Sequence, residues 1–213
     1  MTSPNTIQHS GQADWTLMTT IHQALRRDLD QLLYTTASHT AAFARWRLFR
    51  DQLRLHLAAE QAAVWPLARA KLTGEPRGQA LIDAMEDEYQ LIAPLLAVTD
   101  DAFTMNTDSV RLRQLLARLA TRLGSHLAHE EADALPLLGQ IMSQRELRHI
   151  TTAVRGGRGP RRAALTLPWA LAHAGPQDRA HVLSQLPAPA RLLYQRVWLP
   201  RYTGDSAGVT STG

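Results

Sequence analysis

Cysteine is missing from this 213-residue chain, and long uncharged apolar runs are missing as well. The first absence excludes disulfides, thiolate zinc sites and cysteine nucleophiles. The second argues against a membrane-spanning helix, which requires roughly 20 consecutive apolar residues. The polar segment Met1–Gly11 lacks the apolar stretch of a signal peptide. We therefore expect a cytoplasmic protein without a membrane partner.

A strong excess of one charge is also lacking. The formal net charge is +4, a surplus too small to indicate nucleic-acid binding. Hydrophobic residues make up 45% of the chain and charged residues 20%, a balance typical of a globular protein that buries a sizeable core.

Helical apolar spacing extends over almost the whole chain, and no segment alternates with the period of two that is typical of strands. Four long helices are predicted, over residues 14–37, 40–72 and 77–102, and from the polar stretch 106–109 to about residue 142. The segment Thr73-Gly74-Glu75-Pro76 breaks the second helix from the third. These lengths and short connections predict an all-α fold, an up-down-up-down four-helix bundle over residues 14–142. Residues 1–13 and 203–213 are predicted to be flexible ends.

Residues 143–202 differ from the predicted bundle in composition, with more glycine and proline. Ser143 and Glu146 match a capping box, which predicts the start of a new helix. The Arg-rich and Gly-rich stretch 155–162 has no aromatic residues interleaved, so we interpret it as a linker rather than a phosphate or nucleic-acid site. Beyond it, closely spaced prolines leave room only for short helices. We predict a helical extension that covers the bundle.

One pattern occurs twice in the predicted bundle. His56 and Glu60 are four residues apart and are followed by a proline six residues later; His126 and Glu130 repeat this arrangement 70 residues further on. Residues at i and i+4 lie on the same face of a helix, one turn apart. An imidazole nitrogen together with a carboxylate oxygen suits iron, manganese or zinc. The repeat therefore predicts a metal site.

The other two helices offer His22 and Tyr89 for the same layer. His22 precedes His56 by 34 residues and Tyr89 precedes His126 by 37, in locally similar sequence. Glu60 lies 14 residues before Gly74 and Tyr89 lies 15 after it. Because helices rise by about 1.5 Å per residue, antiparallel neighbours would place these side chains at nearly the same height. A layer of buried polar groups without a metal would be costly.

The paired motifs, with His22 and the segment Met85-Glu86-Asp87-Glu88-Tyr89, resemble the hemerythrin-like (HHE cation-binding) family. The resemblance covers residues 14–142. It implies a non-heme di-iron site with two oxo- or hydroxo-bridged iron ions, although the residues alone leave manganese and zinc open. It also implies a small-molecule ligand (H2O2, O2 or NO) and a monomer or homodimer. The ligand positions of the family fall on His22, His56, Glu60, His126 and Glu130, with both glutamates bridging.

The chain departs from the family at Tyr89, where the third helix usually carries the histidine of a Glu-His pair. A Tyr89 phenolate would add a third anionic oxygen to those of Glu60 and Glu130 and favour ferric iron, as phenolate ligation does in haem proteins. We therefore predict Tyr89 as a metal ligand and catalytic residue of a di-iron oxidoreductase, with peroxide breakdown preferred over oxygen transport. In an alternative, Tyr89 only hydrogen-bonds Glu60 or Glu130 and leaves a coordination position open.

Two other functions fit the same sequence. One is a protein that reversibly binds or senses O2, NO or iron without turnover. The other is a metal-free bundle used for protein interactions. Neighbouring polar residues have plainer interpretations: Glu86, Asp87, Glu88, His129 and Glu131 face solvent or support the ligands, whereas Pro66 and Pro136 end or kink their helices.

Overall fold

The computed structural model describes residues 12–34, 38–155 and 159–203. Within these ranges the chain is helical, and its one β-type contact is an isolated bridge between Gln12 and Ser143. The α-helices of the bundle are α1 (Thr16–Tyr34), α2 (His39–Ala59), α3 (Trp65–Lys71), α4 (Pro76–Thr104), α5 (Ser109–His129) and α6 (Leu135–Ile141). They are followed by α7 (Gln144–Arg155), α8 (Gly159–Leu171), α9 (Pro176–Ser184) and α10 (Ala188–Leu193).

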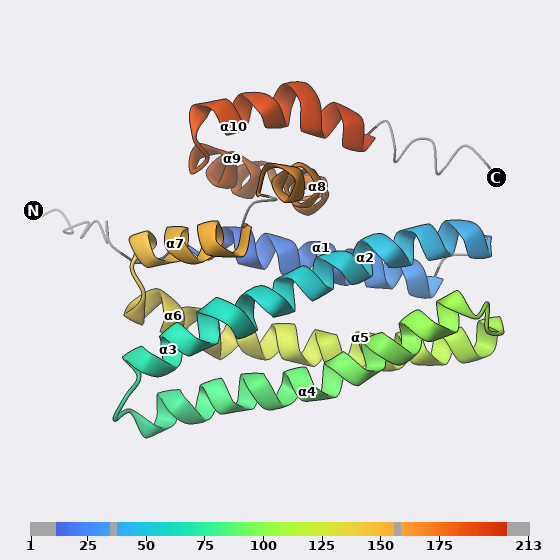
Figure 1. The fold of residues 1–213 in the computed structure, drawn as a ribbon, viewed down its shortest axis with the longest axis horizontal. Helices are drawn as coiled ribbons and strands as arrows, with labels where there is room; N and C mark the ends of the chain where they lie inside the picture. The colour runs from blue at the N-terminus through green and yellow to red at the C-terminus, as the bar shows by residue number, and fades with distance from the viewer. Residues whose placement is uncertain (1–11, 35–37, 156–158, 204–213) are drawn as a thin grey trace, which may run out of the picture.

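Four antiparallel rods form the body of the molecule: α1, α2 with α3, α4, and α5 with α6 (Figure 1). The predicted all-α bundle is therefore confirmed. Gly74 adopts a positive φ of 86° in the turn between α3 and α4, as expected of the breaker there. At the next turn the Asp108 side chain accepts hydrogen bonds from the first backbone N–H groups of α5, which fixes where that helix begins.

The interior contains two apolar clusters with the polar layer near their border. One, around Leu25, Phe49 and Leu119, fills the half of the bundle near the α1–α2 and α4–α5 turns. The other, around Trp65 and Met85, fills the half near the α3–α4 turn. Trp46 and Trp65 are both fully buried, as helical spacing with leucine neighbours predicts.

The sequence predicts that Pro66 and Pro136 end or kink their helices. In the structure neither helix ends at its proline. Each follows a π-helical turn, Glu60–Val64 or Glu130–Ala134, after which α-helix resumes directly. Proline lacks an N–H and its ring clashes with the carbonyl four residues earlier in a regular α-helix. The wider turn, in which Trp65 N–H donates to Glu60 O, accommodates that ring.

The last four α-helices lie over α1 and α2 on one side of the bundle (Figure 1). The capping box is formed, because the Glu146 carboxylate accepts from Ser143 N at 2.8 Å and α7 begins at Gln144. On α8 the buried Trp169 donates from Nε1 to Asp28 Oδ2 on α1 at 2.6 Å. This hydrogen bond to a carboxylate ties the extension to the first helix. The division into separate domains at residue 142 stays a prediction.

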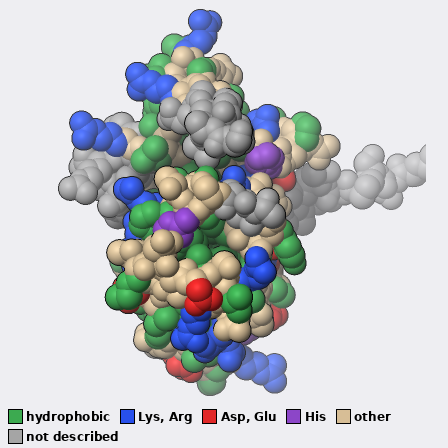
Figure 2. Space-filling model, turned by 90° about the vertical axis from the view of Figure 1, so that its right-hand side faces the viewer, with side chains coloured by type: hydrophobic (Ala, Val, Ile, Leu, Met, Phe, Trp, Pro, Cys, Tyr) green, Lys and Arg blue, Asp and Glu red, His purple; other side chains and the backbone are tan. Residues whose placement is uncertain are grey.

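The surface mixes both charge signs. On the face shown in Figure 2, Lys and Arg side chains are scattered among hydrophobic and uncharged polar ones rather than gathered into one field. None of the helices in the described ranges is both long and apolar enough to cross a bilayer.

Candidate metal centre

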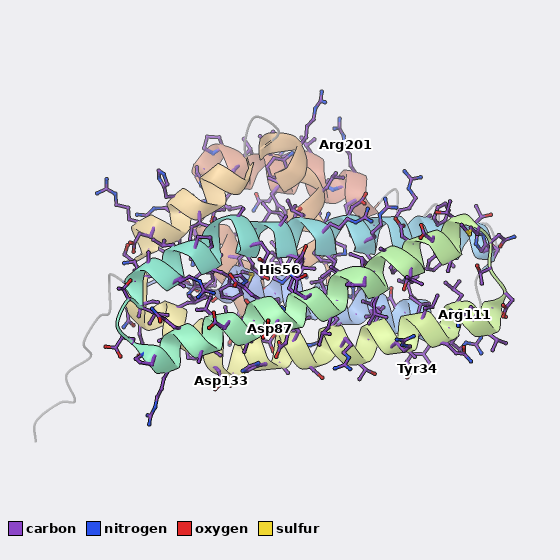
Figure 3. The ribbon with its side chains drawn as sticks, turned by 60° about the horizontal axis from the view of Figure 1, so that its bottom comes forward. Tyr34, His56, Asp87, Arg111, Asp133 and Arg201 are labelled. Carbon is purple, nitrogen blue, oxygen red and sulfur yellow. The ribbon has the colours of Figure 1, made fainter. Side chains whose placement is uncertain are left out.

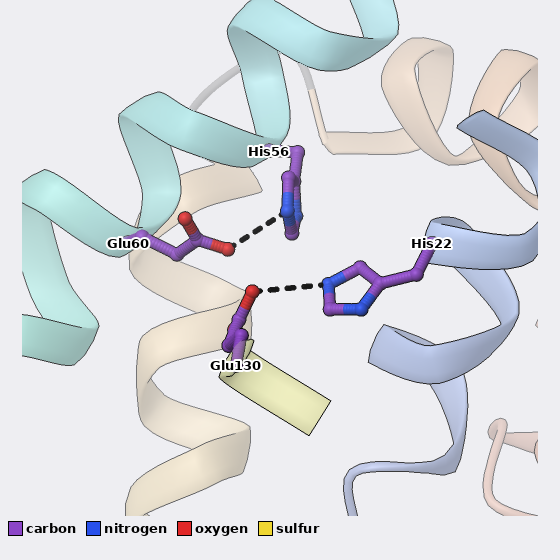
Figure 4. Close-up of side chains that lie close together, drawn as sticks. All are labelled: His22, His56, Glu60 and Glu130. Atoms are coloured by element: carbon purple, nitrogen blue, oxygen red, sulfur yellow. Dashed lines mark ion pairs between the residues drawn. The ribbon is translucent and has the colours of Figure 1, made fainter. Parts of the chain in front are cut away.

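Four buried side chains from three of the rods converge on one point inside the bundle. His22 comes from α1, His56 and Glu60 come from the end of α2 and the π turn after it, and Glu130 comes from the π turn after α5. One ligand atom from each lies within 4.8 Å of all the others (Figure 4). The rings of His22 and His56 meet edge to face with centroids 4.9 Å apart. The spacing of four residues that suggested a metal site does bring His56 and Glu60 to the same point, with Nε2 and Oε1 2.9 Å apart.

The donor atoms at this point are buried without hydrogen-bond partners. His22 Nε2, His56 Nε2, Glu60 Oε1 and both Glu130 oxygens are in this state, although His22 Nε2 and Glu130 Oε2 are only 3.3 Å apart. Short separations without hydrogen-bond geometry are the arrangement expected when two atoms face a common cation. Leaving so many polar atoms unpaired would be costly. Two imidazoles and two carboxylates match the donors that iron, manganese and zinc accept, so these residues fit a metal ion.

The pKa values of His56, Glu60 and His22 are all shifted by their buried surroundings. Burial lowers the pKa of His56 to about 3 and raises the pKa of Glu60 to about 7, because the interior penalises the charged form of each. Burial also opposes the charged form of His22, but the nearby carboxylates of Glu130 and Glu131 outweigh it and raise its pKa to about 9. A bound cation would stabilise both carboxylates and require neutral imidazoles as ligands.

His126 is close to this group but not part of it. Its side chain is buried and its Nε2 has no hydrogen-bond partner, whereas its Nδ1 lies 2.8 Å from Glu88 Oε2. It lies four residues, about one helical turn, before Glu130. Ligation of a metal by His126 stays a prediction. Figure 3 shows His56 between the helices and Asp133, on the same π turn as Glu130, at the periphery.

A comparison with protein families decides the identity of the fold. Residues 14–138 match the family described as Hemerythrin HHE cation binding domain. This chain is a hemerythrin-like protein. Comparisons with curated proteins and with solved structures give no match. Hemerythrin domains bind metal ions, usually iron, and the buried His/Glu cluster could hold one in this hemerythrin-like chain. The assignment of each residue as a ligand, and of the ion as iron, stays a prediction.

Two carboxylates behind the histidines hold the rings of this hemerythrin-like site. Glu131 Oε1 is 2.9 Å from His22 Nδ1, and Arg26 donates two hydrogen bonds to Glu131, at 2.8 and 3.0 Å. Burial opposes ionisation of Glu131, but the hydrogen bonds with His22 and Arg26 lower its pKa to about 2. A carboxylate at Nδ1 orients the ring and leaves Nε2 free to bind a metal.

Glu88 does the same for His126. Its Oε2 lies 2.8 Å from His126 Nδ1, and its Oε1 lies 2.8 Å from His129 Nδ1. The other ring nitrogen of His129, Nε2, lies 3.5 Å from Asp133 Oδ2. Sequence reasoning left Glu88, His129 and Glu131 as surface or supporting residues, and the structure places all three as supports. Arg26 was missed. The available signal was its position four residues after His22, on the same face of α1.

Tyr89 lies partly buried on α4, against the apolar cluster that includes Leu57. It also lines a hollow of about 450 Å³ between α2 and α4, together with Ala58, Gln61 and Ala93. Glu60 Oε1 and both Glu130 oxygens have no hydrogen-bond partner, so the alternative of a hydrogen bond from Tyr89 is not realised at these described atoms. Ligation by Tyr89 stays a prediction.

Proposed function

We propose that this hemerythrin-like protein holds two iron ions and reacts with hydrogen peroxide, breaking it down in preference to carrying oxygen reversibly. The observation that carries the metal function is the set of buried, unpaired nitrogen and carboxylate atoms of His22, His56, Glu60 and Glu130. The preference for peroxide depends on Tyr89, which stands where the family usually has a histidine ligand.

Each residue has a defined task in this proposal. His22, His56 and His126 would hold the metal through neutral nitrogens, and Glu60 and Glu130 would hold it through their carboxylates. Bound iron would supply the electrons for redox chemistry and a Lewis acid that polarises a peroxide oxygen. Glu131 and Glu88 accept hydrogen bonds from Nδ1–H of His22 and His126, which leaves Nε2 of each ring free to bind a metal. The apolar clusters on both sides of the layer exclude bulk water.

Tyr89 is proposed as the remaining ligand, bound as phenolate. Its place supports this role, because it lies on α4 one residue after Glu88, whose carboxylate contacts His126. Three anionic oxygen donors favour ferric iron and disfavour the return to the ferrous state that an oxygen carrier needs.

The test combines metal content, an optical spectrum and oxygen evolution on purified protein grown with iron. We expect iron in the protein, a visible phenolate-to-iron absorption band, and oxygen release when peroxide is added. Tyr89→Phe should abolish the band, while the control Tyr34→Phe, at a tyrosine that is 83% exposed, should retain it. An iron-loaded protein that evolves no oxygen but forms an oxygen adduct released under vacuum would instead support reversible binding.

A further inference from the structure

We propose that the C-terminal extension is a docking surface for a membrane that carries anionic phospholipids. The bilayer surface would be bound by exposed arginines and leucines of the helix over residues 188–203. This role is separate from the metal centre and does not depend on it. The sequence predicts no membrane partner because it lacks a run long enough to span a bilayer, but attachment to a bilayer surface needs no such run.

The first support is the uneven division of charge along the chain. Residues 143–203 contain ten arginines, no lysine and two carboxylates, those of Glu146 and Asp178. Residues 1–142 contain 13 Lys and Arg against 16 Asp and Glu. The net charge is therefore +8 in the extension and −3 in the bundle, and Asp205 in the tail completes the total of +4. A surplus confined to one part of a molecule attracts an anionic partner to that part.

Three exposed arginines of the last helix are available to such a partner: Arg191, Arg196 and Arg201. Within the described ranges, none of these guanidinium groups forms an ion pair with a carboxylate. In the bundle, by contrast, Arg50 lies 2.8 Å from Asp100 and is neutralised by it. In Figure 3 Arg201 projects outward from the C-terminal helices. The positive charge of this helix is therefore directed to the surroundings of the molecule.

The same helix also exposes apolar side chains between its arginines. Leu192 is 57% exposed and Leu193 is 45% exposed. The opposite face holds the helix in place, because Tyr194 is buried and Trp198 packs against the apolar cluster around Leu171. In Figure 1 α10, where this helix begins, lies above α8 and α9 on the side away from the bundle. The two leucines therefore meet a flat partner without any rearrangement of the fold.

The combination of arginine with leucine favours a bilayer over a nucleic acid. The headgroup layer of an anionic membrane attracts guanidinium groups, and the acyl boundary beneath it accepts apolar side chains. Arginine can bury its apolar stem there while its charged head stays among the headgroups. Proteins that bind single-stranded nucleic acids stack bases on exposed aromatic rings, whereas Trp198 packs against the interior of the extension.

Co-sedimentation of the full chain with lipid vesicles tests this proposal. We expect binding to vesicles that contain phosphatidylglycerol, weakening as the salt concentration rises, and at least about tenfold weaker binding to pure phosphatidylcholine vesicles. The triple variant Arg191→Glu, Arg196→Glu, Arg201→Glu should bind the anionic vesicles about 100-fold more weakly, because each arginine near an anionic membrane contributes about fivefold. Leu192→Ser together with Leu193→Ser should weaken binding by about tenfold and leave its salt dependence unchanged.

The matched control carries the same three charge reversals on α5, Arg111→Glu, Arg113→Glu and Arg118→Glu, at exposed arginines of the bundle. Its net charge equals that of the triple variant, yet it should lose less than about fivefold in vesicle binding. Circular dichroism verifies that each variant is folded.

The proposal is overturned if the unaltered protein does not bind the anionic vesicles, or if the two triple variants lose the same affinity. Binding to single-stranded or duplex DNA that is tighter than vesicle binding and unaffected by the leucine substitutions would also overturn it, and would assign the surface to a nucleic acid. None of these results bears on iron binding, which is measured separately.

Discussion

The two His-x-x-x-Glu repeats share their spacing, their following π turn and their proline, yet their surroundings differ. His56 and Glu60 meet His22, whose supporting carboxylate is fixed by an arginine on a helix that the C-terminal extension covers. His126 instead meets Glu88 on α4, a carboxylate that also contacts the partly exposed ring of His129. The duplicated motif therefore predicts where the donor atoms lie, but contacts with the neighbouring helices determine how firmly each histidine is held.

The largest expected effect comes from replacing His56, one of the proposed metal ligands. Iron that is bound only by the folded protein stabilises it by about 4 kcal/mol at a free concentration roughly 1,000 times Kd. His56→Leu should remove most of this gain, yet it should not destabilise the metal-free protein, because it replaces an unpaired buried nitrogen with apolar surface. Thermal unfolding with and without iron measures both effects. An iron-dependent rise in Tm equal to that of the unaltered protein would contradict the role of His56.

The covered side of α1 gives the next effect. Trp169→Phe removes the donor to Asp28 together with the five-membered ring of a fully buried indole, leaving a buried carboxylate short of a partner beside a small cavity. We expect a loss of about 2 kcal/mol in the free energy of unfolding, the usual range for a hydrogen bond to a charged group. Urea denaturation measures it, and release of the tightly held iron should also become faster. Unchanged release with lowered stability would show that the extension does not support the metal position.

A smaller effect is expected from the residues that hold the supporting carboxylates Glu131 and Glu88. Arg26→Lys keeps the charge but loses the two parallel hydrogen bonds to Glu131, and we expect it to weaken iron binding by about 1 kcal/mol, roughly fivefold. His129→Gln, at a residue that contacts the other supporting carboxylate, Glu88, should weaken iron binding less. Chelator competition on both variants compares them directly. An equal loss of affinity in the two variants would remove the distinction between the two supports.

Much of the bundle could be predicted from sequence because helical periodicity and i, i+4 spacing are local properties. The i, i+4 spacing pairs His56 with Glu60 and His126 with Glu130, the local similarity of the two halves suggests His22, and the resemblance of the motifs gave the family. The supports could not be predicted in the same way, since Arg26 and Glu131 are 105 residues apart and meet only through helix packing. The π turns were missed because proline was expected to interrupt the helix, whereas one added residue per turn accommodates its ring. The direction of the Tyr89 side chain depends on the same packing.

The smallest expected effect lies where the extension meets the start of α1. Burial opposes ionisation of Asp14, but hydrogen bonds from Thr16 and His181 lower its pKa to about 2. Because the folded pKa lies below the unfolded value, this stabilisation is present above about pH 4 and is lost as the pH falls towards 2. Asp14 is partly exposed and solvent screens its charge, so Asp14→Asn should cost no more than about 1 kcal/mol at neutral pH and flatten the acid side of the stability profile. Urea denaturation from pH 2 to 7 compares the two proteins.

Anomalous diffraction at the iron edge from crystals of the iron-loaded protein tests the central claim most directly. We predict a strong peak among His22, His56, Glu60 and Glu130. A protein in which these side chains surround no peak, or in which His22 and His56 face different parts of the molecule, would contradict the account.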